Sequence, residues 1–106
     1  MATIGVVGTT GWGTTLAIIT AREGHTVRLL ARSDEEAARL RLANENSQYL
    51  PGASFHQAMR VTHDPREALD KADLTILAVP SNTLRQNVQN VGEYIDDETV
   101  VVSAVK

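Results

Sequence analysis

Three glycines near the start of the chain form a pattern that can bind phosphate. Gly8 directly follows the apolar segment 3–7, and Gly11 and Gly13 come shortly after it. Gly8 and Gly13 match the first and third glycines of the pattern G-x-G-x-x-G, in which a strand turns tightly into a helix. The unpaired N–H groups and the positive dipole end of such a helix attract a diphosphate. The stretch therefore predicts an anion-binding turn.

The second glycine of the pattern is missing, and Thr10 stands in its place. A side chain at this position can keep a phosphate away from the backbone. Alternatively, Gly11 lets the turn rotate so that its N–H groups still face the phosphates, and the Thr10 hydroxyl adds a donor. A structural turn that binds no ligand is a third interpretation, which the predicted strand before the turn and helix after it disfavour.

A second group of polar residues follows the next predicted strand. NAD-binding folds usually place an acidic residue there, which binds the ribose hydroxyls. This chain instead has Arg32 and Ser33, whose guanidinium and hydroxyl can hold a 2′-phosphate, so NADPH is slightly favoured as the cofactor. Asp34 keeps NAD as an alternative. The structural alternatives are a solvated Arg32 and a Ser33 that only caps the next helix.

The elements that must position these residues alternate along the chain. Apolar runs predict strands over residues 3–7, 26–31, 60–62, 74–79 and 99–105. Apolar spacing, capping residues and the stop at Gly24 predict helices over residues 12–23 and 33–46 and after Asp64 and Ser81. Residues 47–59 are predicted to form a connecting loop. This order predicts an α/β fold with a doubly wound, Rossmann-like parallel sheet between two helical layers.

Ligands of such sheets bind beyond the carboxyl ends of the strands. We therefore expect residues 8–13, 31–33 and 80–83 to converge there with Lys106. Pro80 ends a predicted strand and joins this group. Ser81 is more consistent with a helix cap than with a nucleophile, because no G-x-S-x-G pattern surrounds it.

Composition narrows the choice of partners. The chain has 106 residues, of which 42% are hydrophobic and 22% charged, as expected for a single globular domain. Its net charge of −3 and lack of basic runs argue against nucleic acid and anionic membranes as partners. It has no cysteine, and its three histidines lack metal-ligand spacing, so we predict no disulfide and no metal site. We expect no leader or membrane anchor, and a cytoplasmic location.

Five stretches of the sequence together resemble one enzyme family. They are "VGTTGWGTTLA", "GHTVRLLAR", "ENSQYLPG", "ADLTILAVPS" and "VVSAVK", and they are similar to consecutive signatures of NAD(P)-dependent glycerol-3-phosphate dehydrogenases. The pair Trp12-Gly13 and the string Asn46 to Gly52 are the most distinctive parts, and the match covers essentially the whole chain. The resemblance implies reduction of dihydroxyacetone phosphate to sn-glycerol 3-phosphate, a phospholipid precursor, with a nicotinamide cofactor.

The resemblance also assigns roles to individual residues. It implies that Gly11 and Trp12 lie against the cofactor phosphates, Arg32 at the adenosine and Tyr49 on the cofactor side of its loop. It places Lys106 where cofactor and substrate meet, and there an ammonium can bind phosphate or stabilise negative charge on a carbonyl oxygen. The structural alternatives are a Trp12 that anchors the first helix in the core, a Tyr49 that fixes its loop, and a frayed terminal Lys106.

The resemblance further implies that residues 1–106 are a fragment. Family members continue into a helical substrate domain that supplies the acid/base lysine, so we expect no catalysis by this chain alone, and a homodimer is possible for the full protein. His56 departs from the family pattern, which commonly has proline there. Two alternatives stay open: another Rossmann dehydrogenase, of the 6-phosphogluconate or hydroxyacid type, and a non-catalytic nucleotide-binding or redox-sensing module.

Overall fold

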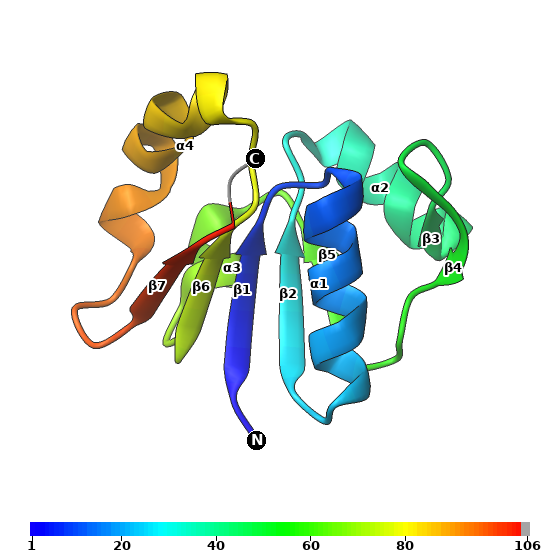
Figure 1. Cartoon of the computed structure of the whole chain (residues 1–106), viewed down its shortest axis with the longest axis horizontal. Helices are drawn as coiled ribbons and strands as arrows, with labels where there is room; N and C mark the ends of the chain where they lie inside the picture. The colour runs from blue at the N-terminus through cyan, green and yellow to red at the C-terminus, as the bar shows by residue number, and fades with distance from the viewer. Residues whose placement is uncertain (105–106) are drawn as a thin grey trace.

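The chain folds around a parallel sheet whose strands run in the order β5-β2-β1-β6-β7 (Figure 1). The structure is a computed structural model that describes residues 1–104. The strands of this sheet are β1 (Thr3–Val7), β2 (Thr26–Leu30), β5 (Met59–Thr62), β6 (Leu74–Leu77) and β7 (Val100–Ser103). Successive strands lie on both sides of β1, so the predicted Rossmann-like, doubly wound α/β fold is confirmed.

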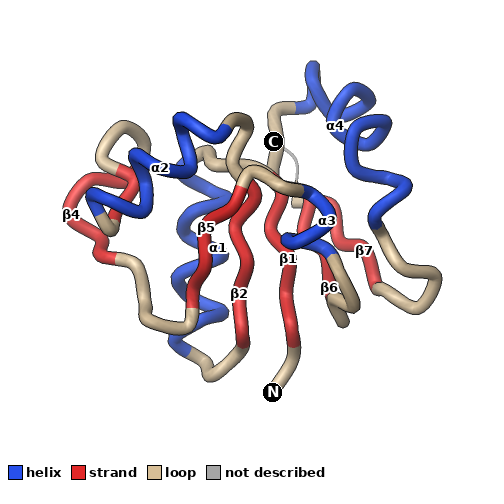
Figure 2. The backbone as a smooth tube through the Cα atoms, turned by 180° about the vertical axis from the view of Figure 1, so that it is seen from behind, coloured by secondary structure: helices blue, strands red, loops and turns tan. Residues whose placement is uncertain are grey.

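Helices cover both faces of the sheet, as the two opposite views in Figures 1 and 2 show. They are α1 (Gly11–Arg22), α2 (Asp34–Ala43), α3 (Pro65–Leu69) and α4 (Leu84–Val91), with short 3-10 turns η1 (Ser81–Thr83) and η2 (Gly92–Tyr94). One apolar cluster joins α1 and α2 to the sheet. A second cluster joins α3 and the end of α4 to the opposite face. The central strands are therefore buried on both sides, as their apolar composition predicts.

Local sequence signals explain where most of the helices begin and end. Gly24, with a φ of +99°, follows the last residues of α1 in the left-handed region, as predicted. The Ser33 hydroxyl accepts a hydrogen bond from the Glu36 N–H at 3.1 Å and caps α2. Asp64 caps α3 by accepting from the Arg66 N–H at 3.0 Å. These three predictions are confirmed.

Two predictions for the middle of the chain are wrong. Helix α2 ends at Ala43 instead of about residue 46, because Asn44 takes a left-handed conformation with a φ of 56°. The predicted loop 47–59 instead contains the second strand of an antiparallel hairpin, formed by β3 (Glu45–Asn46) and β4 (Leu50–Ser54). The mixed polar and proline-containing sequence of β4 lacks the alternation that marks a strand.

The start of α4 also differs from the prediction. Ser81 begins the 3-10 turn η1, and neither η1 nor α4 has a side-chain cap. The Thr83 hydroxyl bonds to the Pro80 carbonyl instead, at 3.1 Å. Ser81 is therefore not the helix cap that its type predicted.

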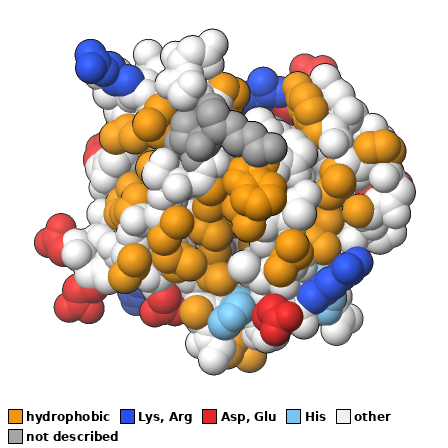
Figure 3. All heavy atoms as spheres, in the orientation of Figure 1, with side chains coloured by type: hydrophobic (Ala, Val, Ile, Leu, Met, Phe, Trp, Pro, Cys, Tyr) orange, Lys and Arg blue, Asp and Glu red, His pale blue; other side chains and the backbone are white. Residues whose placement is uncertain are grey.

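Strand β7 lies at an edge of the sheet and is much more exposed than the others. Its valines, Val100 to Val102, are all exposed, although they form the most β-branched run in the chain. Figure 3, which has the orientation of Figure 1, shows hydrophobic side chains gathered on the surface of the molecule that faces the viewer.

Across residues 1–104, no helix has both the length and the apolar character needed to cross a membrane.

Candidate functional site: the cavity at the carboxyl ends of the strands

A cavity of about 610 Å³ lies beyond the carboxyl ends of β1, β2 and β6. Strand β1 pairs with β2 on one side and with β6 on the other, so this is the point where the strand order reverses. The predicted convergence of the three loops is confirmed, since each contributes to the lining. Among the predicted site residues, those that line the cavity are Gly8, Thr10, Arg32, Tyr49 and Pro80.

Four other predicted site residues, all within the described part of the chain, do not line the cavity. Gly11, Trp12 and Gly13 form the first turn of α1, next to the lining residues Gly8 to Thr10, and Ser33 follows Arg32 at the start of α2. The side chain of Trp12 is partly exposed, so it is not an anchor buried in the core. Lys106 lies outside the described residues.

The turn between β1 and α1 requires glycine at its two matched positions. Gly8 has a φ of +123°, and a Cβ atom there would overlap the carbonyl oxygen of Ala78. A Cβ atom on Gly13 would in turn overlap the carbonyl oxygen of Gly8. The first turn of α1 thus packs directly against the strand end, as the third glycine of the pattern allows.

Thr10 is part of the turn's own hydrogen bonding. Its hydroxyl accepts from the Gly13 N–H at 3.2 Å and donates to the Ala78 carbonyl at 3.2 Å. It therefore caps α1 and ties the helix to the end of β6. Because the hydroxyl has a single proton, it can donate to a phosphate only after giving up the bond to Ala78.

The start of α1 carries the features of an anion site. Its first turn contains no acidic residue, so nothing on the helix offsets the positive end of its dipole. Gly11 begins the helix, and a Cβ there would come within 3.1 Å of the Tyr49 carbonyl oxygen. Gly11 therefore lets the β3–β4 hairpin lie close to the helix start.

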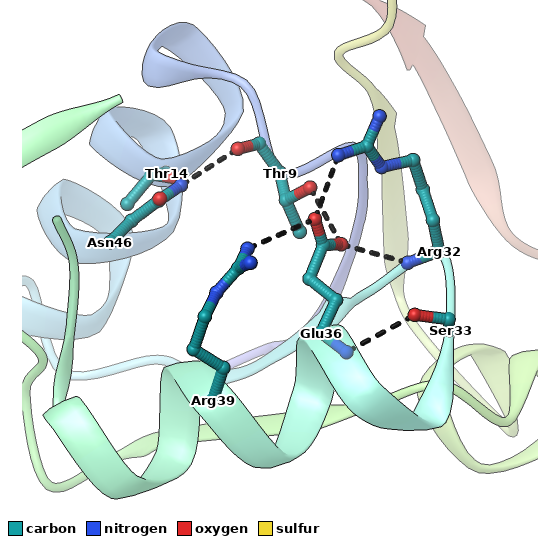
Figure 4. A network of polar contacts seen from close by, with 7 residues as sticks. All are labelled: Thr9, Thr14, Arg32, Ser33, Glu36, Arg39 and Asn46. Atoms are coloured by element: carbon teal, nitrogen blue, oxygen red, sulfur yellow. Dashed lines mark hydrogen bonds and ion pairs between the residues drawn. The ribbon is translucent and has the colours of Figure 1, made fainter. Parts of the chain in front are cut away.

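Asn46 fastens this hairpin to the glycine turn (Figure 4). Its side chain is 1% exposed, and its Nδ2 donates to the Thr9 carbonyl at 2.7 Å and to the Thr14 hydroxyl at 2.9 Å. The Thr9 carbonyl belongs to the turn, and the Thr14 hydroxyl belongs to α1. Asn46 thereby positions Tyr49, which reaches the cavity from the same hairpin. Sequence reasoning used Asn46 only as part of a signature and missed this role.

Arg32 reaches the cavity from the end of β2 and is paired with a buried carboxylate. Its Nη2 lies 2.8 Å from Oε2 of Glu36, and the two side chains are 67% and 7% exposed respectively. Oε1 of Glu36 accepts from the backbone N–H of Arg32 at 3.0 Å and from the Thr9 hydroxyl at 2.9 Å. Arg39 Nη2 lies 3.7 Å from Oε2. Arg32 is thus neither fully solvated nor unpaired, and Glu36 links the β2–α2 turn to the glycine turn (Figure 4).

The charges of this pair stabilise each other. Burial on its own would raise the pKa of Glu36, but the hydrogen bonds from Arg32 and Thr9 and the charge of Arg32 outweigh burial, so the pKa of Glu36 is lowered. The Glu36 carboxylate raises the pKa of Arg32, and Tyr49 adds a smaller contribution. Both groups are therefore charged at neutral pH.

Sequence reasoning also missed a polar wall of the cavity. It is formed by the side of α4 and its preceding turn that carries Thr83, Gln86, Asn87 and Asn90. His63, one of the three histidines to which the sequence assigned no metal-binding role, lines the cavity as well, with Nδ1 3.4 Å from the Asp34 carboxylate. In the sequence, the spacing of Gln86, Asn87 and Asn90 by three and four residues is the signal that could have indicated that these amides share one face of α4.

A metal site finds no support in the described part of the chain. No group of three or more histidine, aspartate or glutamate side chains is placed to hold a metal ion among residues 1–104.

Comparisons with known proteins agree with this geometry. Residues 3–106 match the family model for the N-terminus of NAD-dependent glycerol-3-phosphate dehydrogenase. The chain is 39% identical over 106 residues to glycerol-3-phosphate dehydrogenase [NAD(P)+] of Corynebacterium kroppenstedtii, covering 100% of this chain and 32% of that protein. It is 45% identical over 85 residues to the enzyme of the same name from Thermus thermophilus, covering 80% of this chain and 26% of that protein.

A solved structure shows the same arrangement. The crystal structure of glycerol-3-phosphate dehydrogenase from Coxiella burnetii superposes with a TM-score of 0.92 at 26% identity, covering 99% of this chain and 32% of that one. The chain thus spans about a third of the length of these relatives. The chain belongs to the NAD-dependent glycerol-3-phosphate dehydrogenase family, whose N-terminal, NAD-binding region it matches.

Proposed function

We propose that the cavity binds NAD(P)H and that the full-length protein containing this chain reduces dihydroxyacetone phosphate to sn-glycerol 3-phosphate, for phospholipid precursors, in the cytoplasm. The observation that carries this proposal is the glycine turn at the mouth of the cavity. Gly8 and Gly13 leave no room for a side chain, and the turn between them places Gly8 to Thr10 in the cavity lining, with the start of α1 directly beside it.

The residues present fit a dinucleotide. The start of α1 suits the diphosphate, since a helix N-terminus with no acidic residue in its first turn attracts anions. Arg32 lies at the carboxyl end of β2, where this fold class holds the adenosine ribose. Its guanidinium can bind a 2′-phosphate, which supports acceptance of NADPH as well as NADH. Two apolar residues, Val7 at the end of β1 and Val79 just beyond β6, line the cavity between the polar loops.

Hydride transfer needs more than this chain. The bound cofactor would supply a hydride to the substrate carbonyl carbon, and the growing charge on the oxygen must be stabilised. The family resemblance assigns Lys106 to that region, and its ammonium suits a carbonyl oxygen or a phosphate. We further propose that a helical domain beyond residue 106 supplies the acid/base group, so that this chain alone binds cofactor without turnover.

Two measurements test the proposal. Calorimetric titration of the 106-residue chain and of the full-length protein with NADH and with NADPH should show saturable binding. Full-length protein should then oxidise NAD(P)H only when dihydroxyacetone phosphate is added, as followed by the cofactor absorbance. Cofactor binding by the full-length protein without turnover would instead indicate a non-catalytic nucleotide-binding module. Absence of binding by the full-length protein would contradict the proposed site.

The Thr10 position is tested by one further variant. Replacing Thr10 with glycine restores the pattern G-x-G-x-x-G but removes the cap on α1 and the bond to Ala78. A large gain in cofactor affinity would show that Thr10 obstructs the phosphates. An unchanged or weaker affinity would show that the hydroxyl serves the turn better than a second glycine does.

A further inference from the structure

Glu36 is a buried carboxylate that lies behind two residues of the cavity lining, Thr9 and Arg32, and bonds to both. It joins the two turns expected to hold the two ends of the adenosine diphosphate, because its Oε1 accepts from Thr9 in the glycine turn and from the backbone N–H of Arg32. Its Oε2 accepts from the guanidinium of Arg32. Both carboxylate oxygens are thus engaged, and the side chain is 7% exposed.

Because the Glu36 carboxylate lies directly behind Arg32, it reduces the net positive charge that a ligand meets at this arginine. One nitrogen of the guanidinium is held by Glu36, while the arginine as a whole stays exposed at the cavity. A 2′-phosphate that binds Arg32 therefore approaches a positive charge that is already offset by a negative one close behind it. A ribose hydroxyl carries no charge and is little affected by that carboxylate. The pairing therefore weakens the attraction for the phosphate selectively.

Arg39 does not cancel this effect. Its Nη2 lies 3.7 Å from Oε2 of Glu36, compared with 2.8 Å for Nη2 of Arg32. Both arginine side chains are more than half exposed, so the distance distinguishes the two pairs. The closer contact, and the one that forms a hydrogen bond, is with Arg32.

From these contacts we infer that Glu36 is a specificity-determining residue: its pairing with Arg32 limits the discrimination between NADPH and NADH, so that the site accepts both. This inference rests on the proposed binding of NAD(P)H in the cavity. Glu36 is a positioning residue that acts on the cofactor through Arg32: its carboxylate holds the guanidinium in place and offsets the positive charge of the guanidinium.

The test compares Glu36→Gln with the unaltered full-length protein. The glutamine keeps the size of the side chain and an oxygen acceptor for Thr9, but it removes the negative charge. Calorimetric titrations at matched ionic strength should show affinity for NADPH rising roughly two- to fivefold, with affinity for NADH unchanged. A ratio of the two affinities that stays constant or shifts toward NADH would overturn the inference.

Two control variants isolate the contact. Glu35→Gln removes the same charge from an exposed side chain in the same helical turn, and it should leave the affinity ratio nearly unchanged. In an Arg32→Ala background, Glu36→Gln should no longer alter the ratio, because the effect acts through the guanidinium. An effect that persists without Arg32, or one equalled by Glu35→Gln, would contradict the inference.

The outcomes separate this inference from the proposed function. If the unaltered protein binds neither cofactor, the proposed function fails. If it binds both and Arg32→Ala leaves their ratio unchanged, the binding site stands and the role of Glu36 is overturned. Should Glu36→Gln fail to fold, Glu36→Asp retracts the carboxylate from the guanidinium and should raise the ratio in the same direction by a smaller factor. An unchanged ratio in that variant would overturn the inference.

Discussion

The two sides of the sheet, to either side of β1, differ sharply in how their strands are covered. On one side of β1, strand β2 is packed between β1 and β5, and α1 and α2 cover one face of it. On the other side, β7 is the edge strand and within residues 1–104 pairs with β6 alone, and all of its residues are exposed. A run of β-branched residues therefore predicts a strand but does not predict whether the strand is buried. A strand is buried only where other elements of the fold pack against its faces.

Long-range hydrogen bonds that involve side chains also differ between the two sides of β1, since the two made to Thr9 on the β2 side are buried and one made near β7 is only partly buried. Glu36 and Asn46 both bond to Thr9, so they fasten α2 and the hairpin to the glycine turn on the β2 side. On the β7 side, the Thr99 hydroxyl bonds to the Ala72 carbonyl at 2.7 Å, at the opposite end of the sheet from the cavity. We therefore expect substitutions around the glycine turn to lower stability far more than substitutions in β7.

The largest effect is expected at Gly13. Alanine there places a Cβ against the Gly8 carbonyl oxygen, so the helix must move away from the strand end. We expect a loss of about 3 kcal/mol or more in the free energy of unfolding, since backbone offers no flexible atom that can yield. Urea unfolding of the 106-residue chain measures the loss.

A matched glycine provides the control for Gly13. Gly92 has helical angles, with φ of −54°, and a Cβ there meets nothing within 4 Å. Gly92→Ala should therefore be neutral or stabilise the chain by up to about 1 kcal/mol, because it restricts the unfolded chain. Equal losses in the two variants would mean that the close approach at Gly13 does not hold the turn together.

Asn46→Ala should give the next largest effect. It leaves the Thr9 carbonyl and the Thr14 hydroxyl without their buried donor and should cost about 1–3 kcal/mol. It also frees the hairpin that carries Tyr49, so cofactor affinity should fall as well. Unfolding and titration with NADH measure the two effects.

An exposed amide is the control for Asn46. Gln86 donates to Asn90 at 3.1 Å on the surface of α4, where water replaces a lost bond. Gln86→Ala should change the free energy of unfolding by no more than about 0.5 kcal/mol. If Asn46→Ala proved equally mild, the hairpin would not depend on this buried amide.

Acid should weaken the β2 side through Glu36. Because its pKa is lowered in the folded chain by Arg32 and Thr9, with Arg39 also nearby, its contribution is present above the unfolded pKa of about 4.3. The contribution is lost as the pH falls through the lower, folded pKa. Glu36→Gln should therefore lose about 1 kcal/mol at pH 7 and little at pH 3, by urea unfolding at each pH.

Glu35→Gln is the matched control for this pH dependence. Glu35 is exposed in the same turn of α2, so removing its charge should lower the stability at pH 7 much less than Glu36→Gln does. A loss in Glu36→Gln that is the same at both pH values would show that the carboxylate contributes no charge-dependent stability.

The sequence allowed the sheet and the cavity edge to be predicted, because these depend on local signals. The apolar segment before Gly8 and the caps Ser33 and Asp64 act within a few residues of themselves. The network around Glu36 and Asn46 could not be predicted in this way. Glu36 matches a capping box in sequence, but its carboxylate accepts from Arg32, four residues before it, and from Thr9, 27 residues away in the chain. Asn46 likewise bonds to Thr9, 37 residues away. Local patterns do not specify these long-range partners, which the tertiary fold brings together.

The smallest effect is expected in β7, where a single pair of substitutions tests the whole comparison. Val27 in β2 is 0% exposed and Val100 in β7 is 60% exposed. Valine to threonine keeps the branched shape favoured in strands and adds one hydroxyl. At position 27 that hydroxyl is buried in an apolar cluster and should cost about 1–3 kcal/mol. At position 100 water satisfies it, so the change should stay within about 0.5 kcal/mol. Urea unfolding of both variants measures the difference, and equal losses would show that β7 is as well covered in solution as β2.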